Sequence, residues 1–394
     1  MPFHLFSNPH EGDFVTLAED LSLRLFRKMH ARVNTLAAEG GAPEVRIDLA
    51  GWTAPRMGTR GWLPELGAVR MGIHAGVRPD DLSWLTGQFT LAAYLMELLP
   101  SVDLEIAGRH PVTLAGHFLR GPRLRFQGTA TRLTVLDASG TVVLSLQKVV
   151  FDGMAPVWAR DPERDIVRVG SGAVAVLTDA EWMTYWNTDS PKDPLAHDIP
   201  AQKRQVEETL AFMEQHLPLQ YLWVSLLMRE VVPLIDAGPQ RTRSQSFLLW
   251  PGQVQLSETS RLQTISLLMH ECTHQYFNML LWFGRVVKAG APDAYSVLKG
   301  RNRPLERILL GFHAFANILL VYSTLRSSPG PIPPKDIEDQ LRNLRPIVSD
   351  LDGVLLQNWE QHLEQMGREL YLPLRERLVA VDLLPVSGAV KQTG

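Results

Sequence analysis

The sequence is poor in cysteine, in long apolar runs and in excess charge, and each shortage argues against a class of protein. Cys272 is the only cysteine among 394 residues, so the chain cannot form an internal disulfide. That composition is typical of a reducing compartment, and we expect a cytoplasmic location. The most apolar stretch, 305–325, contains charged side chains, and the N-terminus lacks the basic start and apolar core of a signal peptide. We therefore expect no membrane-spanning segment, and a secreted protein with few cysteines is the weaker alternative to a cytoplasmic one.

Charge and motif content argue against further classes. The formal net charge is −3 and the isoelectric point is about 6.5, which argues against nucleic acid or an anionic membrane as the main partner. The sequence has no glycine-rich phosphate loop ending in Lys-Ser or Lys-Thr and no Gly-x-Ser-x-Gly elbow, so P-loop enzymes and α/β-hydrolases are disfavoured. The sequence does not fix the oligomeric state.

The N-terminal half combines a helical region with a β-rich region. Residues 14–38 and 81–100 carry apolar side chains at helical spacing. Residues 101–155 alternate β-branched and polar side chains around a turn at Asp137–Gly140, which predicts a hairpin. A short strand is predicted at 173–177.

The C-terminal half is predicted to be mainly helical, with a strand region at 244–257 that is either a strand pair or an edge strand broken by Pro251-Gly252. The helical stretches are 201–235, 258–288, 303–327 and 335–378. The fold class is therefore α+β. We expect a helical N-terminal region over 1–100, a β-rich region over 101–198 and a mainly helical metal-binding catalytic domain over 199–394.

A metal-binding motif lies inside the helix predicted over 258–288. It reads His270-Glu271-Cys272-Thr273-His274. Histidines four residues apart lie one turn apart on one helix face, so both imidazoles can bind one ion. Glu271 projects at a neighbouring angle and can reach a metal-bound water or orient a ligand. A helix of this kind with a strand before it is zincin-like, and we interpret the chain as a metalloenzyme.

The third ligand is expected from the next long helix. His313 lies there among apolar neighbours, and we favour it over Glu306, about two turns earlier on the same face. Asn317, one turn beyond His313, is expected to support the cofactor site. Two histidines with a carboxylate suit zinc or the facial triad of non-haem iron, and three histidines suit either metal. Spacing alone therefore does not choose the metal.

Two segments carry a resemblance to a known family. LMHECTHQYFNMLL, followed by RNRPLERILLGFHAFANILLVY, resembles the HExxH-type 2-oxoglutarate-dependent peptide β-hydroxylases. These are HExxH motif-containing peptide-modification proteins of ribosomal peptide (RiPP) natural-product pathways. Residues 205–257 also resemble the family, as an amphipathic helix ending in VVPL and then a strand. The likeness covers about half of the chain, roughly 200–330.

The resemblance implies a dioxygenase that uses iron(II), 2-oxoglutarate and dioxygen to hydroxylate a side chain of a ribosomally made precursor peptide. His270, His274 and His313 match the expected metal ligands, and Glu271 matches the motif glutamate, whose role stays open. Arg303 is our prediction for the 2-oxoglutarate carboxylate, because a guanidinium can give a carboxylate two parallel hydrogen bonds. Arg301 and Arg307 compete with it.

Two other functions stay open at this point. A zinc metallopeptidase would use Glu271 as general base toward a zinc-bound water, although the chain lacks the Met-turn extension of the metzincin peptidases. A metal-stabilised module that only binds a peptide is the non-enzymatic alternative. Cys272 is interpreted as a small buried residue. Trp182, Tyr185 and Trp186 are interpreted as a core or interface cluster rather than a peptide groove.

Overall fold

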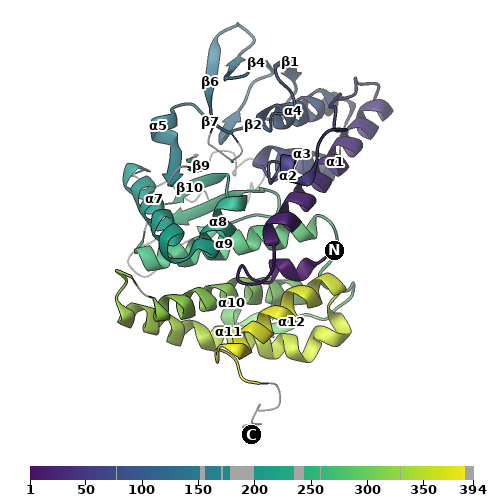
Figure 1. Ribbon diagram of the computed structural model, residues 1–394. Helices are drawn as coiled ribbons and strands as arrows, with labels where there is room; N and C mark the ends of the chain where they lie inside the picture. The colour runs from purple at the N-terminus through teal and green to yellow at the C-terminus, as the bar shows by residue number, and fades with distance from the viewer. Residues whose placement is uncertain are drawn as a thin grey trace. The chain divides into compact units, whose positions relative to one another are not determined.

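The structure is a computed structural model that describes residues 1–76, 78–150, 156–169, 172–177, 199–234, 244–257, 259–328 and 330–386. Within them the protein is α+β, as predicted, with helices in both terminal regions and sheets in the middle (Figure 1). Unit 1 comprises 1–17, 212–224 and 265–394, and unit 2 comprises 18–211 and 225–264. These units interleave along the chain, unlike the three consecutive regions expected from the sequence.

The first sheet of unit 2 is antiparallel. Its strands follow the order β1 (Val102–Ala107), β4 (Arg123–Gly128), β5 (Arg132–Leu136), β6 (Val142–Val149) and β7 (Val157–Ala159). The predicted hairpin is confirmed as β5 and β6, joined by a turn that needs the positive φ of Gly140, +83°. The buried positions of β4 alternate with exposed ones, as a sheet with one covered face requires.

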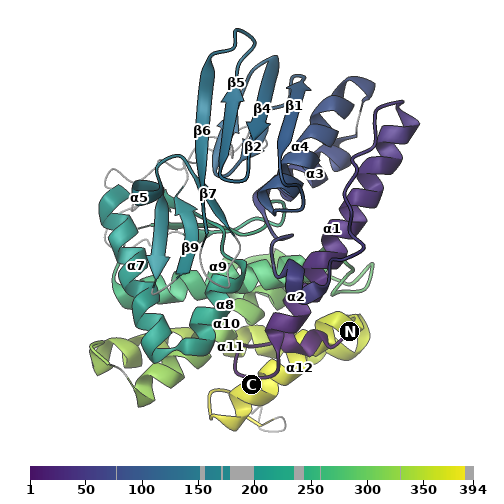
Figure 2. The same cartoon turned by 45° about the horizontal axis from the view of Figure 1, so that its top comes forward.

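Helices α3 (Pro64–Ala75) and α4 (Leu82–Leu95) lie beside this sheet (Figure 2). Gly87 of α4 packs so closely on Ile106 of β1 that an added Cβ would lie 2.5 Å from that side chain. Gln88 exchanges hydrogen bonds of 2.8 and 3.0 Å with the backbone of Thr113. Thr113 belongs to a small hairpin of β2 (Val112–Leu114) and β3 (His117–Leu119). The expected helix over 81–100 is thus present, whereas α3 was not predicted.

The second sheet of unit 2 is mixed. Its order is β11 (Ser244–Gln245), β12 (Gln253–Ser257), β10 (Glu230–Leu234), β9 (Gly172–Leu177) and β8 (Ile166–Val169). The central strand β10 is parallel to both of its neighbours, and β10 and β12 are buried throughout, as parallel strands usually are. The strand predicted at 173–177 and the strand pair at 244–257 are confirmed.

The single helix predicted over 201–235 is wrong. The chain forms α7 (Ile199–His216), α8 (Pro218–Leu227) and then β10. Pro218 starts a new helix because it lacks the N–H that would continue the previous one. The residues Glu230-Val-Val-Pro-Leu have the β-branched side chains of a buried strand, and tertiary pairing with β9 and β12 decides their conformation.

Unit 1 is mainly helical. Its helices are the C-terminal part of α9 (Arg261–Leu281), then α10 (Leu305–Ser327), α11 (Pro334–His362) and α12 (Gln365–Ala380). Helices α10, α11 and α12 lie side by side (Figure 1). Between α9 and α10 stands a hairpin of β13 (Ala294–Ser296), the 3-10 turn η3 (Val297–Lys299) and β14 (Arg301–Arg303). The helices predicted over 258–288 and 303–327 are confirmed, as are those predicted over 335–378, which form two helices that meet near Leu363.

The remaining helical elements are short apart from one. The long one is α1 (Phe14–Glu39), which confirms the helix predicted over 14–38. The short ones are η1 (Phe3–Phe6), α2 (Ala54–Met57), η2 (Pro79–Asp81) and α5 (Pro162–Asp165). Among the described residues, α10 alone is long and apolar enough to cross a membrane, and 72% of its most apolar window is buried inside the protein. That burial fits a core helix.

Candidate metal centre

Helix α9 carries the motif in the way that the spacing predicts. Ser260 caps the helix, since its hydroxyl accepts the backbone N–H of Gln263 at 3.4 Å. His270 and His274 are both half-buried, and their ring centroids lie 4.4 Å apart with the planes at 68°. The two imidazoles therefore lie one turn apart and close together, as two ligands of one ion must.

His313 projects from α10 and is fully buried. Its Nε2 donates to the carbonyl oxygen of Phe6, so its Nδ1 carries the lone pair in this tautomer. In the described part of the chain, Nδ1 of His313 and Nδ1 of His274 have no hydrogen-bond partner. A ring with one N–H on a backbone carbonyl and the other nitrogen free is the arrangement that metal-binding histidines adopt.

Asn317 holds the same N-terminal segment. Its amide donates to the carbonyl of Ser7 at 2.9 Å and to that of His313 at 2.8 Å. Asn317 is buried, and the structure gives it a positioning role beneath His313.

The pKa values of all three histidines are lowered by burial. Burial holds the pKa of His274 well below its ordinary value, and the charges of His270, His313 and Arg307 lower it further. Burial lowers the pKa of His313 to about 4 and also lowers the pKa of His270. All three rings are therefore neutral near pH 7, which is the form that binds a metal.

The three rings nevertheless do not form a finished ligand set. Within the described residues, no group of three or more His, Cys, Asp or Glu side chains is arranged to hold a metal ion. Phe315 of α10 packs against His270 with ring centroids 5.0 Å apart, and His313 is engaged by Phe6. The donor chemistry fits a metal ion, and the geometry provides two ligands with a third candidate nearby.

Glu271 and Cys272 occupy other faces of α9. Glu271 is buried, and its charge raises the pKa of His270, so the carboxylate lies beside the first histidine. Cys272 is fully buried, and its thiol contacts the carbonyl of Val224 at 3.8 Å. Burial raises the pKa of this thiol, which confirms the interpretation of Cys272 as a small core residue.

The aromatic residues near the motif form a core. Tyr276 stacks on Trp223 with ring centroids 3.5 Å apart, and its hydroxyl donates to the carbonyl of Trp223 at 2.9 Å. Trp223 in turn donates to the hydroxyl of Thr273 at 3.3 Å. These contacts fix the orientation of α9. The predicted cluster of Trp182, Tyr185 and Trp186 lies outside the described residues.

Arg303 lies in β14, directly before the Pro304 that precedes α10. It is half-buried. Burial lowers the pKa of its guanidinium, and the charges of Arg307 and Arg301 lower it further. The arginine that we predicted and its two competitors thus lie close enough together to repel. Glu306, the alternative third ligand, lies in the first turn of α10 and is half-buried.

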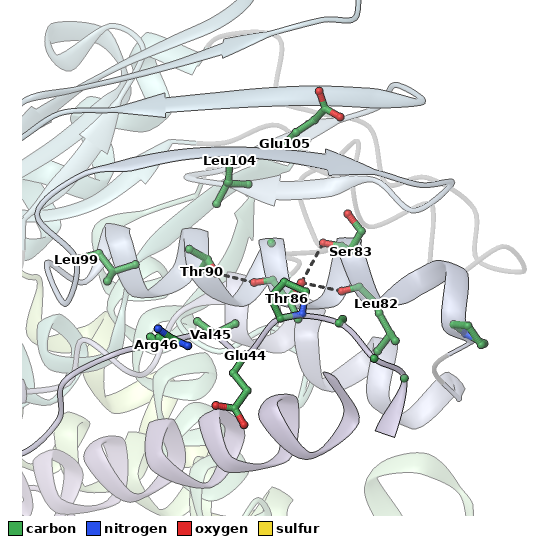
Figure 3. A pocket seen from close by; sticks show the side chains of 16 residues that line it. Glu44, Val45, Arg46, Leu82, Ser83, Thr86, Thr90, Leu99, Leu104 and Glu105 are labelled. Carbon is green, nitrogen blue, oxygen red and sulfur yellow. Dashed lines mark hydrogen bonds between the residues drawn. The ribbon is translucent and has the colours of Figure 1, made fainter. Parts of the chain in front are cut away.

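Unit 2 holds two features that the sequence did not reveal. The first is a groove of about 590 Å³ between the loop at 40–46, α4 and β1, toward which Leu104 projects (Figure 3). Its threonines Thr86 and Thr90 donate to carbonyls of their own helix, at 2.8 and 2.7 Å. None of the residues predicted for a metal or cosubstrate lines this groove.

The second feature is a pair of buried glutamates. Glu65 of α3 accepts the backbone N–H of Ala115 at 2.6 Å, and Glu230 of β10 accepts the amide of Gln253 at 2.9 Å. Burial raises the pKa of Glu65 to about 7. Burial and the charge of Glu65 raise the pKa of Glu230 well above its ordinary value. Residues so far apart in the sequence give no local signal of their proximity.

Comparison with known proteins adds no assignment, since no family model and no curated protein matches this chain.

Proposed function

We propose that this protein is a non-haem iron(II), 2-oxoglutarate-dependent dioxygenase that hydroxylates side chains of a ribosomally synthesised precursor peptide in the cytoplasm. The observation that carries the proposal is a pair of neutral histidines one helical turn apart, next to arginines that have no acidic partner among the described residues. The histidines suit a divalent metal. The arginines suit a dicarboxylate cosubstrate, which a peptidase does not need.

The metal would be held by His270 and His274, with His313 as the third ligand. His313 brings a lone pair on Nδ1, and its N–H on Phe6 keeps that lone pair in place. Asn317 supports this arrangement by tying the backbone of His313 to the N-terminal segment. Glu271, buried beside His270, would orient that ligand or hold a water.

Arg303 would bind the distal carboxylate of 2-oxoglutarate. A half-buried guanidinium gives two charge-assisted hydrogen bonds in a fixed geometry, and the bound carboxylate would relieve the repulsion among Arg301, Arg303 and Arg307. Iron with this cosubstrate and dioxygen supplies the oxidation, in which a β C–H becomes C–OH while succinate and carbon dioxide are released. The apolar rings around the site, such as Phe315 against His270, would limit the access of water.

A zinc metallopeptidase is the second candidate, because Glu271 directly follows His270 and lies buried beside it. In that reaction Glu271 would take the proton of a zinc-bound water that attacks an amide carbonyl. A peptide-binding module without catalysis is the third.

One reconstitution separates these candidates. Apo-protein is loaded anaerobically with iron(II) or with zinc and then given 2-oxoglutarate, air and a peptide substrate. Succinate with iron alone supports the dioxygenase, and peptide cleavage with zinc supports the peptidase. Glu271→Gln should lower a peptidase rate by about a thousandfold or more, as expected for loss of a general base. Intact cleavage by this variant would exclude the hydrolytic mechanism.

A further inference from the structure

A cluster of cations stands beside the histidine pair. It consists of Lys299, Arg301 and Arg303 on the β13–η3–β14 hairpin and Arg307 in the first turn of α10. We call these four residues the cationic cluster. Gly300 makes the hairpin turn possible, since its φ of +62° lies in the left-handed region.

The hairpin register places two of the arginines on one face. Arg301 is opposite Ser296 and Arg303 is opposite Ala294 in the antiparallel pair. Residues two apart on a strand point to the same side, so both arginines share the face of Ser296, which is buried. Tyr295 and Asn302 share the opposite face, where Tyr295 is 56% exposed. Arg303 is half-buried on the face of Ser296, whereas Arg301 is exposed on that face, as Tyr295 is on the opposite one.

The cationic cluster lies close to the candidate ligands. Arg307 lies about two turns before Phe315 on α10, and the ring of Phe315 packs against His270 with centroids 5.0 Å apart. Within the described residues, no ion pair joins any of the four cations to a carboxylate, whereas other surface arginines such as Arg125 and Arg342 are paired. Four like charges beside one another are unfavourable without an anion.

The hairpin also exposes apolar side chains near these charges. Val297 and Leu298 are 59% and 38% exposed, beside the exposed Lys299. Apolar and cationic groups together suit a polypeptide segment that carries carboxylates. A nucleic acid would require a larger basic surface than these four cations.

We propose that the cationic cluster docks an acidic stretch of the polypeptide substrate beside His270 and His274. The inference rests on the proposed function, in which a dicarboxylate cosubstrate balances two of the four positive charges. The remaining two are then free to attract Asp or Glu side chains near the residue that reacts. Lys299, Arg301 and Arg307 are exposed. Lys299 and Arg301 lie on the same hairpin as the exposed Val297 and Leu298 and are the natural contacts for the peptide.

Peptide binding tests the inference without any turnover. Fluorescent peptides of equal length, one rich in Asp and Glu, one with the corresponding amides and one rich in Lys, are titrated with the full chain. We expect the acidic peptide to bind about tenfold more tightly than the amide peptide, and the advantage to shrink as salt rises from about 0.05 to about 0.3 M. Equal binding of the acidic and amide peptides would overturn the proposal.

Matched variants test which residues cause the preference for the acidic peptide. The double variant Lys299→Ala/Arg301→Ala should lose most of the preference for the acidic peptide, and Lys299→Arg/Arg301→Lys should keep it. The control double variant Arg326→Ala/Lys335→Ala removes two exposed cations of the same unit and should bind like the wild type. A control variant as weak as the test variant would show that only net charge matters and would overturn the assignment.

Two further probes address other polyanions. A single-stranded DNA oligonucleotide and vesicles containing phosphatidylserine are titrated under the same conditions, and tighter binding of either than of the acidic peptide contradicts the proposal. The peptide-binding result does not depend on which reaction the protein catalyses. Acidic-peptide binding without succinate formation would reject the dioxygenase alone, and succinate formation without a preference for acidic peptides would reject the docking alone.

Discussion

His313 donates a hydrogen bond from Nε2 to the carbonyl oxygen of Phe6, a residue 307 positions earlier in the chain. The contact fixes the imidazole tautomer and leaves Nδ1 buried with no hydrogen-bond partner among the described residues. A buried nitrogen without a partner costs free energy, and a bound metal ion would remove that cost. The relationship therefore favours a ligand role for His313.

Substitution of His313 should separate its structural role from its ligand role. We expect His313→Gln to destabilise the fold by about 1–3 kcal/mol through the altered contact with Phe6. The dissociation constant of the metal should rise by about a hundredfold or more in the variant that remains folded. Calorimetric metal titration of protein with a native circular-dichroism spectrum provides the measurement. Unchanged affinity would make His313 a packing residue only, and Glu306→Gln would then be tested as the third ligand.

The histidine pair should control metal content directly. His270→Ala and His274→Ala should each reduce the bound metal per chain from about one to near zero and lower turnover by about a thousandfold. Metal analysis after dialysis checks the first effect. His74→Ala removes an exposed histidine of α3 and should leave metal content unchanged. Retention of metal by both pair variants would contradict the site.

Arg303 should control the affinity for 2-oxoglutarate. We expect Arg303→Ala to raise the KM for the cosubstrate by about ten- to a hundredfold, the cost of losing charge-assisted hydrogen bonds. Arg303→Lys should recover only part of the affinity, because lysine cannot form the paired contact. Parallel measurements on Arg301→Ala and Arg307→Ala identify the carboxylate ligand, since the largest effect should fall on one of the three.

The glutamate pair in unit 2 should make stability depend on pH. Because burial raises the pKa of Glu65 from 4.5 to about 7, the folded state binds more protons than the unfolded chain between these values. The free energy of unfolding should therefore decrease as pH rises through that window, by roughly 3 kcal/mol at most. Glu230, whose pKa is also raised, should extend the decrease to higher pH.

Glu65→Gln tests this dependence. The amide oxygen can still accept the N–H of Ala115, and its NH₂ can donate to Glu230. Urea unfolding at about pH 5 and about pH 8 should show a smaller difference in the variant than in the wild type. A wild type equally stable at both pH values would show that the two carboxyl groups do not carry the shifts described.

Local sequence patterns predicted the elements whose structure depends on near neighbours. The spacing of His270 and His274 is sufficient to place both rings on one face of α9, and the Asp137–Gly140 turn is sufficient to predict the β5–β6 hairpin. Where the local pattern was ambiguous, pairing with other strands decided the conformation. Glu230–Leu234 is apolar enough for a buried helix, but it forms a strand because it lies between β9 and β12. The alternatives for the third ligand stayed open for the same reason.

The sequence by itself determined an α+β chain with a histidine pair and a nearby helix that carries His313 and begins after Arg303. Only the tertiary structure decided that His313 turns to Phe6, that Glu65 and Glu230 share a buried site, and that Lys299 and Arg307 act on the two histidines of α9. The physical reason is the separation along the chain of the residues that interact. Helix faces and tight turns follow from residues within a few positions, whereas burial and charge at a site depend on segments that meet only when the chain folds.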